Sequence, residues 1–96
     1  MIMASGKSVF KVQGGKLLKI SLEHSGGWIE NVRIAGDFFL HPEESVGLVE
    51  KGLQGAALDE SSLKGKIEAI VKKNSLKLFG FAPADLAAAI MMAVKQ

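Results

Sequence analysis

The feature that most constrains the fold is a change of hydrophobic period near the middle of the chain. Residues 8–37 alternate apolar and polar side chains, most clearly where Leu18, Ile20 and Leu22 are separated by single residues. A period of two is typical of a strand with one buried face. The second half instead spaces its apolar residues three and four apart, as amphipathic helices do. We therefore expect an α+β fold in which strands precede helices.

Glycine pairs divide the first half into three strands. Gly14-Gly15 follows the run over residues 8–13, and Gly26-Gly27 precedes the run over residues 28–37. Glycine accepts the positive φ angles that tight hairpins require. Because turns this short join only antiparallel strands, the pattern predicts a three-stranded antiparallel meander.

The third run has an interrupted apolar face. Trp28, Val32 and Ile34 share one parity, which predicts that they face the core, but Glu30 has the same parity. The run leads into two adjacent phenylalanines, Phe38 and Phe39. Neighbouring residues of a strand point to opposite faces, so one ring should be exposed as part of a contact surface. The alternative is that the strand has ended and both rings turn inward.

About three helices are expected in the second half, packed on one face of the meander. His41-Pro42-Glu43-Glu44 is a plausible first start, because proline fits the first helical position and acids favour the positive end of the helix dipole. Glycines should keep that helix short, with its end near Gly55. Asp59 can cap the second helix, and Pro83 can begin the third. The apolar positions of the last two helices are Leu63, Ile67, Ile70, Val71, Leu86, Ala89, Ile90 and Ala93.

Length and composition exclude several classes of protein. The chain has 96 residues, of which 48% are hydrophobic, so we expect a single domain over residues 1–96 with residues 1–7 flexible. The absence of cysteine excludes disulfides, thiolate metal sites and a cysteine nucleophile. No apolar run approaches the roughly 20 residues that span a bilayer, and the start lacks the apolar core of a signal peptide. We therefore expect a cytoplasmic protein without a membrane partner.

Polar clusters offer two further interpretations. Asp37, His41 and Glu44 lie in one short segment and could hold a metal or serve as acid and base, but strand-end and helix-cap chemistry accounts for them. We therefore expect neither a metal site nor a catalytic residue.

The second cluster consists of Lys64, Lys66, Lys72, Lys73 and Lys77. A net charge of +2 and 6% aromatic residues favour a solvated helix face over a nucleic-acid site. A small interaction or nucleic-acid-binding module using these lysine-rich helices is the alternative function.

The order of motifs resembles the C-terminal accessory domain of lipoate–protein ligases, in the archaeal type where that domain is a separate small subunit. The resemblance rests on Gly15-Lys16-Leu17, Gly27-Trp28-Ile29, the segment Val32 to Glu44 and Leu53-Gln54-Gly55. The most specific part is Ile34-Ala35-Gly36-Asp37-Phe38-Phe39 with the following Pro42-Glu43-Glu44. It covers residues 8–95.

The resemblance implies an accessory subunit in a heterodimer. In that family a large catalytic subunit binds ATP, magnesium and lipoate, makes lipoyl-adenylate and transfers the lipoyl group to a lysine of an acceptor domain. The small domain binds none of these cofactors and is needed for adenylation. The family provides no catalytic motif to carry over. Our interface candidates, Asp37, Phe38, Phe39 and His41, rest on their position at a strand end and on their expected exposure alone.

Overall fold

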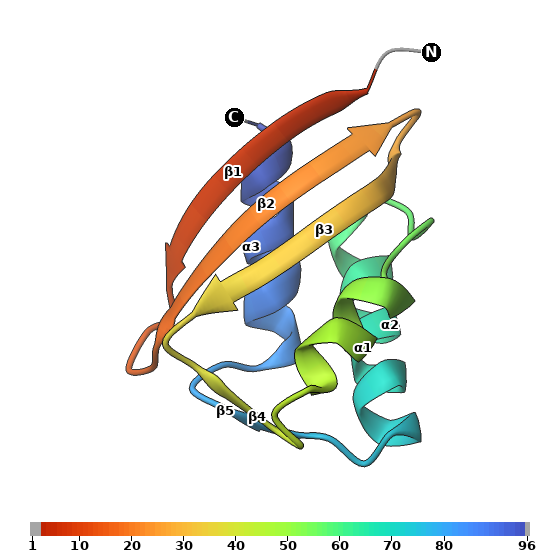
Figure 1. The fold of residues 1–96 in the computed structure, drawn as a ribbon. Helices are drawn as coiled ribbons and strands as arrows, with labels where there is room; N and C mark the ends of the chain where they lie inside the picture. Colours follow the sequence, from red (N-terminus) through yellow and green to blue (C-terminus); the bar gives the residue numbers. More distant parts are fainter. Residues whose placement is uncertain (1–2, 96) are drawn as a thin grey trace.

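The computed structural model describes residues 3–95 and shows a sheet covered on one side by helices (Figure 1). The strands β1 (Ala4–Lys11), β2 (Leu17–Ser25) and β3 (Trp28–Gly36) form an antiparallel sheet in the order β1-β2-β3. The helices α1 (Ser45–Gly52), α2 (Glu60–Lys73) and α3 (Pro83–Val94) lie behind it. The predicted α+β meander with three helices on one face is confirmed.

The core lies between the sheet and the helices. Leu18, Ile20 and Leu22 of β2 are buried, as their alternation predicted. α3 packs across β1 and β2, while α1 packs beside β3 (Figure 1). The buried residues of the second and third helices include Leu63, Ile67, Leu86, Ala89, Ile90 and Ala93, all of which were predicted from their spacing. Within residues 3–95, no helix covers the opposite face of the sheet (Figure 1).

The prediction that Trp28 faces the core was wrong. Trp28 is 54% exposed, and its neighbour Ile29 is buried instead. The pairing of β2 with β3 shifts by one residue, since Glu23 lies opposite Asn31 while His24 lies opposite Ile29. A β-bulge adds one residue to a strand and reverses the faces on its two sides. The acid that interrupted the apolar pattern is this extra residue.

The first strand begins earlier than its alternation indicated. β1 starts at Ala4, and residues 4–7, which we expected to be flexible, pair with the end of β2 as far as His24. Backbone hydrogen bonding sets this boundary, and the small polar side chains there give no hydrophobic signal. Residues 1 and 2 of the same segment lie outside the described residues.

The first helix also starts elsewhere than predicted. α1 begins at Ser45, so Pro42 is not its first residue and its first turn contains no acid. His41 is extended within a strand, and the Ser45 amide donates to the Pro42 carbonyl at 3.0 Å in the turn that follows. The expectation of a short helix is confirmed, because α1 ends at Gly52.

The caps of the other two helices match the sequence. The Asp59 carboxylate accepts a hydrogen bond from the Ser62 amide at 2.9 Å, which satisfies a free N–H at the start of α2. Pro83 is the first residue of α3, and the Asp85 carboxylate accepts from the Ala82 amide at 2.7 Å. Among residues 3–95, no helix is long and apolar enough to cross a membrane.

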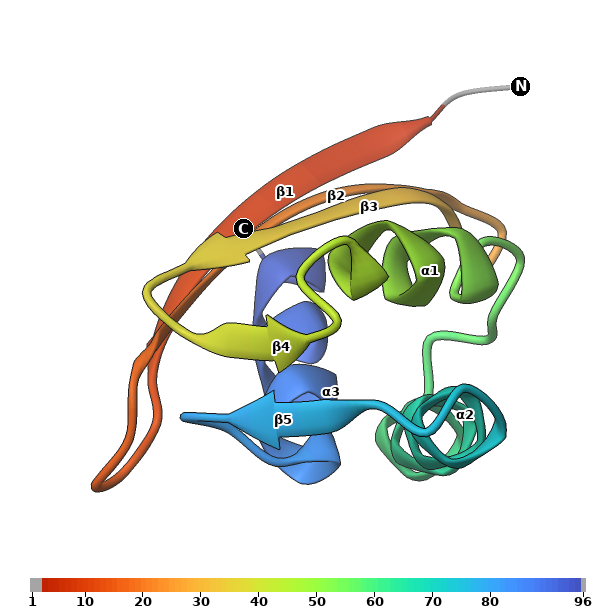
Figure 2. The same ribbon diagram turned by 60° about the horizontal axis from the view of Figure 1, so that its bottom comes forward.

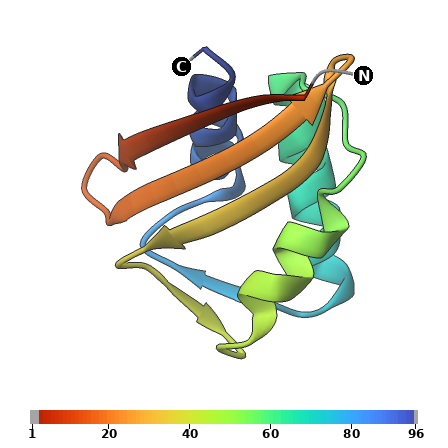
Figure 3. The same ribbon diagram turned by 45° about the horizontal axis from the view of Figure 1, so that its top comes forward.

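A second, two-stranded sheet was not predicted. The strands β4 (Phe39–His41) and β5 (Lys77–Phe79) pair antiparallel, one before α1 and the other between α2 and α3. Figures 2 and 3 show this β4–β5 ribbon at the end of the molecule where β3 finishes. Three residues are too few to show an alternating pattern, and the partner strands lie far apart in the sequence.

Candidate functional site

The β4–β5 ribbon is positioned by the sharp bend that follows β3. Gly36 has a φ of 145°, and a Cβ at this position would overlap the carbonyl oxygen of Leu17. Only glycine tolerates both the positive φ and the close approach of β2. The next residue, Asp37, accepts a hydrogen bond from the Leu17 amide at 2.7 Å through its carboxylate. The bend is therefore tied to β2, and the chain leaves it as β4.

The outer face of the ribbon carries two exposed aromatic rings. Phe39 lies opposite Phe79, and His41 lies opposite Lys77, in the register of β4 and β5. Phe39 is 64% exposed and Phe79 is 52% exposed. On the inner face Leu40 is buried in the core. Isolated exposed apolar residues are ordinary, but two large exposed rings opposite each other on one ribbon make a candidate interaction surface. We call Phe39 and Phe79 the aromatic pair.

The two adjacent phenylalanines, Phe38 and Phe39, point in different directions. Phe38 packs inward against Phe81, with ring centroids 5.0 Å apart and an interplanar angle of 68°. This edge-to-face geometry is favourable for aromatic rings. Phe39 is the exposed ring, so the predicted exposure of one ring is confirmed, while its place in a contact surface stays a prediction.

The other interface candidates differ in their surroundings. The hydrogen bond from the Leu17 amide lowers the pKa of Asp37, and the nearby Lys16 and Lys11 act in the same direction. Its carboxylate thus stabilises the bend within this chain. His41 is exposed beside Lys77 on the same face as the aromatic pair. The structure brings Phe39 and His41 together on one surface and places Phe38 beneath it.

Sequence reasoning missed Phe79, which adds a second exposed aromatic ring to the ribbon. Its only signal was the short apolar run Leu78-Phe79-Gly80-Phe81, which precedes the third helix. Since strand pairing was not predicted there, nothing in the sequence placed this ring beside Phe39.

Neither of the two polar clusters of the sequence forms a single site among the described residues. Among residues 3–95, no group of three histidine or acidic side chains is arranged to hold a metal ion. Of the five clustered lysines, Lys66 and Lys73 line a groove between α1 and α2, whereas Lys77 lies in β5. The lysines therefore do not form a single surface.

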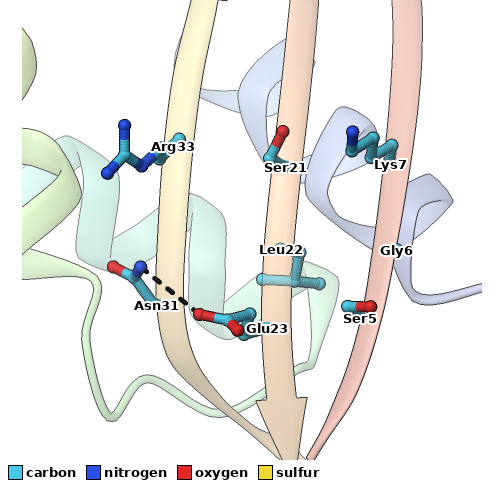
Figure 4. Close-up of a pocket in the computed structure, with 8 residues that line it drawn as sticks. All are labelled: Ser5, Gly6, Lys7, Ser21, Leu22, Glu23, Asn31 and Arg33. Carbon is cyan, nitrogen blue, oxygen red and sulfur yellow. Dashed lines mark hydrogen bonds between the residues drawn. The ribbon is translucent and has the colours of Figure 1, made fainter.

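A shallow hollow of about 520 Å³ lies on the uncovered face of the sheet. Lys7, Ser21 and Arg33 form one cross-strand row in it, as Figure 4 shows. In the next row Asn31 donates to the Glu23 carboxylate at 3.5 Å. Most residues that line the hollow have short or charged side chains, whereas the aromatic pair is apolar.

Comparison with known proteins identifies what the fold resembles. No protein-family model matches the chain. Lipoate-protein ligase A subunit 2 of Thermoplasma acidophilum is 34% identical over 44 residues, which are 46% of this chain and 47% of that protein. The match thus spans about half the length of the curated relative.

A solved structure extends the similarity to nearly the whole chain. It describes an archaeal lipoylation system from Thermoplasma acidophilum, a bi-partite lipoate protein ligase and its E2 lipoyl domain. One of its chains matches with a TM-score of 0.71 and 26% identity, over 93% of this chain and 94% of that chain. This chain resembles the second subunit of an archaeal lipoate–protein ligase. The resemblance to the accessory-domain family inferred from the sequence is confirmed.

Proposed function

We propose that this protein is the accessory subunit of a two-component lipoate–protein ligase. It forms a heterodimer with a catalytic subunit, and both are required for ATP-dependent adenylation of lipoate before transfer to a lysine of an acceptor protein. The observation that carries the proposal is the match over 93% of the chain to a chain of the archaeal lipoylation system. The curated relative, whose name designates a second subunit, supports the same role.

The aromatic pair is the surface proposed to contact the catalytic subunit. Aromatic side chains are enriched at the centres of protein interfaces, where each buries a large area at low entropic cost. Phe39 and Phe79 stand on a ribbon whose inner face is anchored in the core through Leu40. The rings are therefore presented by a fixed backbone, which reduces the ordering cost of association. His41 and Lys77 supply the polar rim beside them.

The chemistry itself is assigned to the catalytic subunit, which would bind ATP, magnesium and lipoate. This chain contributes through association. An accessory subunit changes the activity of its partner only by binding one conformation of that partner better than another. Docking that stabilises the closed form of the catalytic subunit would exclude water and order loops around the adenylation site. We place the complex in the cytoplasm, where ATP is available.

The direct test is lipoate-dependent release of pyrophosphate from ATP. The purified catalytic subunit is assayed with and without this chain, and transfer of the lipoyl group from premade lipoyl-adenylate is assayed in parallel. We expect pyrophosphate release only when both subunits are present, together with transfer by the catalytic subunit alone. Equal release without this chain, and no co-elution of the two proteins, would overturn the proposal.

A further inference from the structure

A groove between α1 and α2 combines an apolar floor with basic walls. It has a volume of about 510 Å³ and is lined by Leu48, Lys51, Gly52, Lys66, Ala69, Ile70, Lys73 and Asn74. We call this the α1–α2 groove. It shares no lining residue with the β4–β5 ribbon, so it is a separate surface from the aromatic pair.

The floor exists because the two helices approach closely at one point. A Cβ at Gly52 would lie 2.7 Å from the Cδ1 atom of Ile70, so the lack of a side chain at Gly52 lets the Ile70 side chain lie against α1. One turn earlier in α1, Leu48 is 49% exposed, and Ala69 is also exposed. An apolar leucine is thus left open to solvent directly above a close helix contact.

The three lysines of the groove have no acidic partner at the helical contact spacings of three or four residues. Lys66 and Lys73 flank Ala69 and Ile70 at spacings of three and four residues, which places all four on one face of α2. No Asp or Glu stands three or four residues from Lys51, Lys66 or Lys73. None of the residues that line the groove is acidic. The Glu50 carboxylate is turned to β3, where it accepts from the Ile34 amide at 2.7 Å.

Another face of α2 has a different charge pattern. Lys64 and Lys72 each stand four residues from Glu68, the spacing at which opposite charges on a helix attract. Their positive charge is therefore partly offset within the helix. The groove concentrates positive charge that the chain leaves uncompensated, beside apolar side chains that it leaves uncovered.

We propose that the α1–α2 groove binds an acidic amphipathic segment of a second protein. Apolar side chains of that segment lie on Leu48 and Ile70, and its carboxylates pair with Lys51, Lys66 and Lys73. Charge complementarity accelerates encounter and sets the register, while the apolar floor provides the area that is buried. This inference concerns a surface apart from the aromatic pair and does not rest on the proposed ligase function.

The test uses a synthetic helical peptide with leucines on one face and glutamates beside them. The full chain, labelled with ¹⁵N, is titrated with this probe while amide shifts are followed by NMR. We expect the largest shifts at Leu48, Gly52 and Ile70, and binding that weakens as salt is raised. The same peptide with every glutamate replaced by glutamine should bind roughly tenfold more weakly. Shifts centred on Phe39 and Phe79 would overturn the proposal.

Two double variants distinguish binding in the α1–α2 groove from a general attraction of the acidic peptide to lysine side chains. Lys66→Gln with Lys73→Gln should weaken probe binding by roughly tenfold, while Lys64→Gln with Lys72→Gln should change it by less than about twofold. Both pairs remove two exposed charges from the same helix, but only the control pair also loses its attraction to Glu68, so thermal unfolding of both variants is recorded alongside. Leu48→Gln should weaken binding without any change of charge. Equal losses for the two lysine pairs would overturn the proposal. So would tighter binding of a single-stranded RNA oligonucleotide at the same amides.

Discussion

Phe39 and Phe79 lie directly opposite each other on β4 and β5, and both rings are exposed to solvent. A cross-strand aromatic pair contributes about 0.2–1 kcal/mol to a sheet, so its exposed rings add little to folding. The same rings would be fully desolvated at the centre of an interface, where aromatic side chains contribute most. Substitutions in the aromatic pair should therefore affect association with a partner more than the stability of the isolated chain.

Phe79→Ala is expected to weaken the complex with the catalytic subunit while leaving the isolated chain folded. Truncating an aromatic residue at the centre of an interface costs about 2 kcal/mol or more, which is roughly thirtyfold in Kd. The Kd is measured by isothermal titration calorimetry, and thermal unfolding of the free chain is recorded alongside. Val9 is an apolar residue of β1 that is 60% exposed and lies apart from the β4–β5 ribbon, so Val9→Ala is the control. An unchanged Kd for Phe79→Ala would exclude the aromatic pair as the contact.

Gly36→Ala is expected to destabilise the chain strongly, because it adds a clash with the Leu17 carbonyl to the cost of a positive φ. Gly14→Ala isolates the second cost, since its φ is 70° and a Cβ there meets nothing within 4 Å. We expect about 1 kcal/mol for Gly14→Ala and at least about 2 kcal/mol for Gly36→Ala. Urea unfolding provides both values. Equal losses would mean that the bend after β3 shifts to accept a side chain.

Asp37→Asn is expected to remove part of the pH dependence of stability. The pKa of Asp37 is lowered in the folded chain by the hydrogen bond from the Leu17 amide. A carboxyl whose pKa is lower in the folded state stabilises it above the unfolded pKa of about 3.9. That contribution is lost as the pH falls through the lower, folded value. The variant should therefore be less stable than wild type at pH 7, and the difference should close in acid. Urea midpoints measured from pH 7 to pH 2 test this, and a difference that stays constant with pH would contradict it.

Substitution by alanine should affect the stability of the chain differently at two buried serines. The Ser8 hydroxyl donates to the Ala89 carbonyl at 2.7 Å and links β1 to α3, so Ser8→Ala should cost about 1 kcal/mol. The Ser45 hydroxyl is buried without a hydrogen-bond partner among the described residues. Removing a buried, unsatisfied hydroxyl relieves its desolvation cost, and alanine also favours the helix. Ser45→Ala should therefore leave stability unchanged or raise it by up to about 1 kcal/mol, as thermal unfolding would show. A loss comparable with that of Ser8→Ala would contradict this assignment.

Local sequence patterns determined the elements whose signals are contained within a few residues. The alternation around Leu18, Ile20 and Leu22 defined β2, and the glycine pairs defined the two hairpins. Asp59 and Pro83 marked the starts of α2 and α3 because capping depends on atoms within one helical turn. The segment around Phe38 and Phe39 was also sufficient to indicate the resemblance that the comparisons bear out.

Where the position of a side chain depends on partners that are distant in the sequence, only the tertiary structure decided that position. The bulge at Glu30 exposed Trp28, because the register of β3 is fixed by pairing with β2 and not by its own alternation. The aromatic pair exists because β5 returns beside β4 after two helices, and three-residue strands gain stability only from each other and from the core. The sequence by itself thus determined the class of fold and singled out Phe38 and Phe39 as the segment where one ring could be exposed. The pairing of distant backbone segments decided that Phe79 would join Phe39.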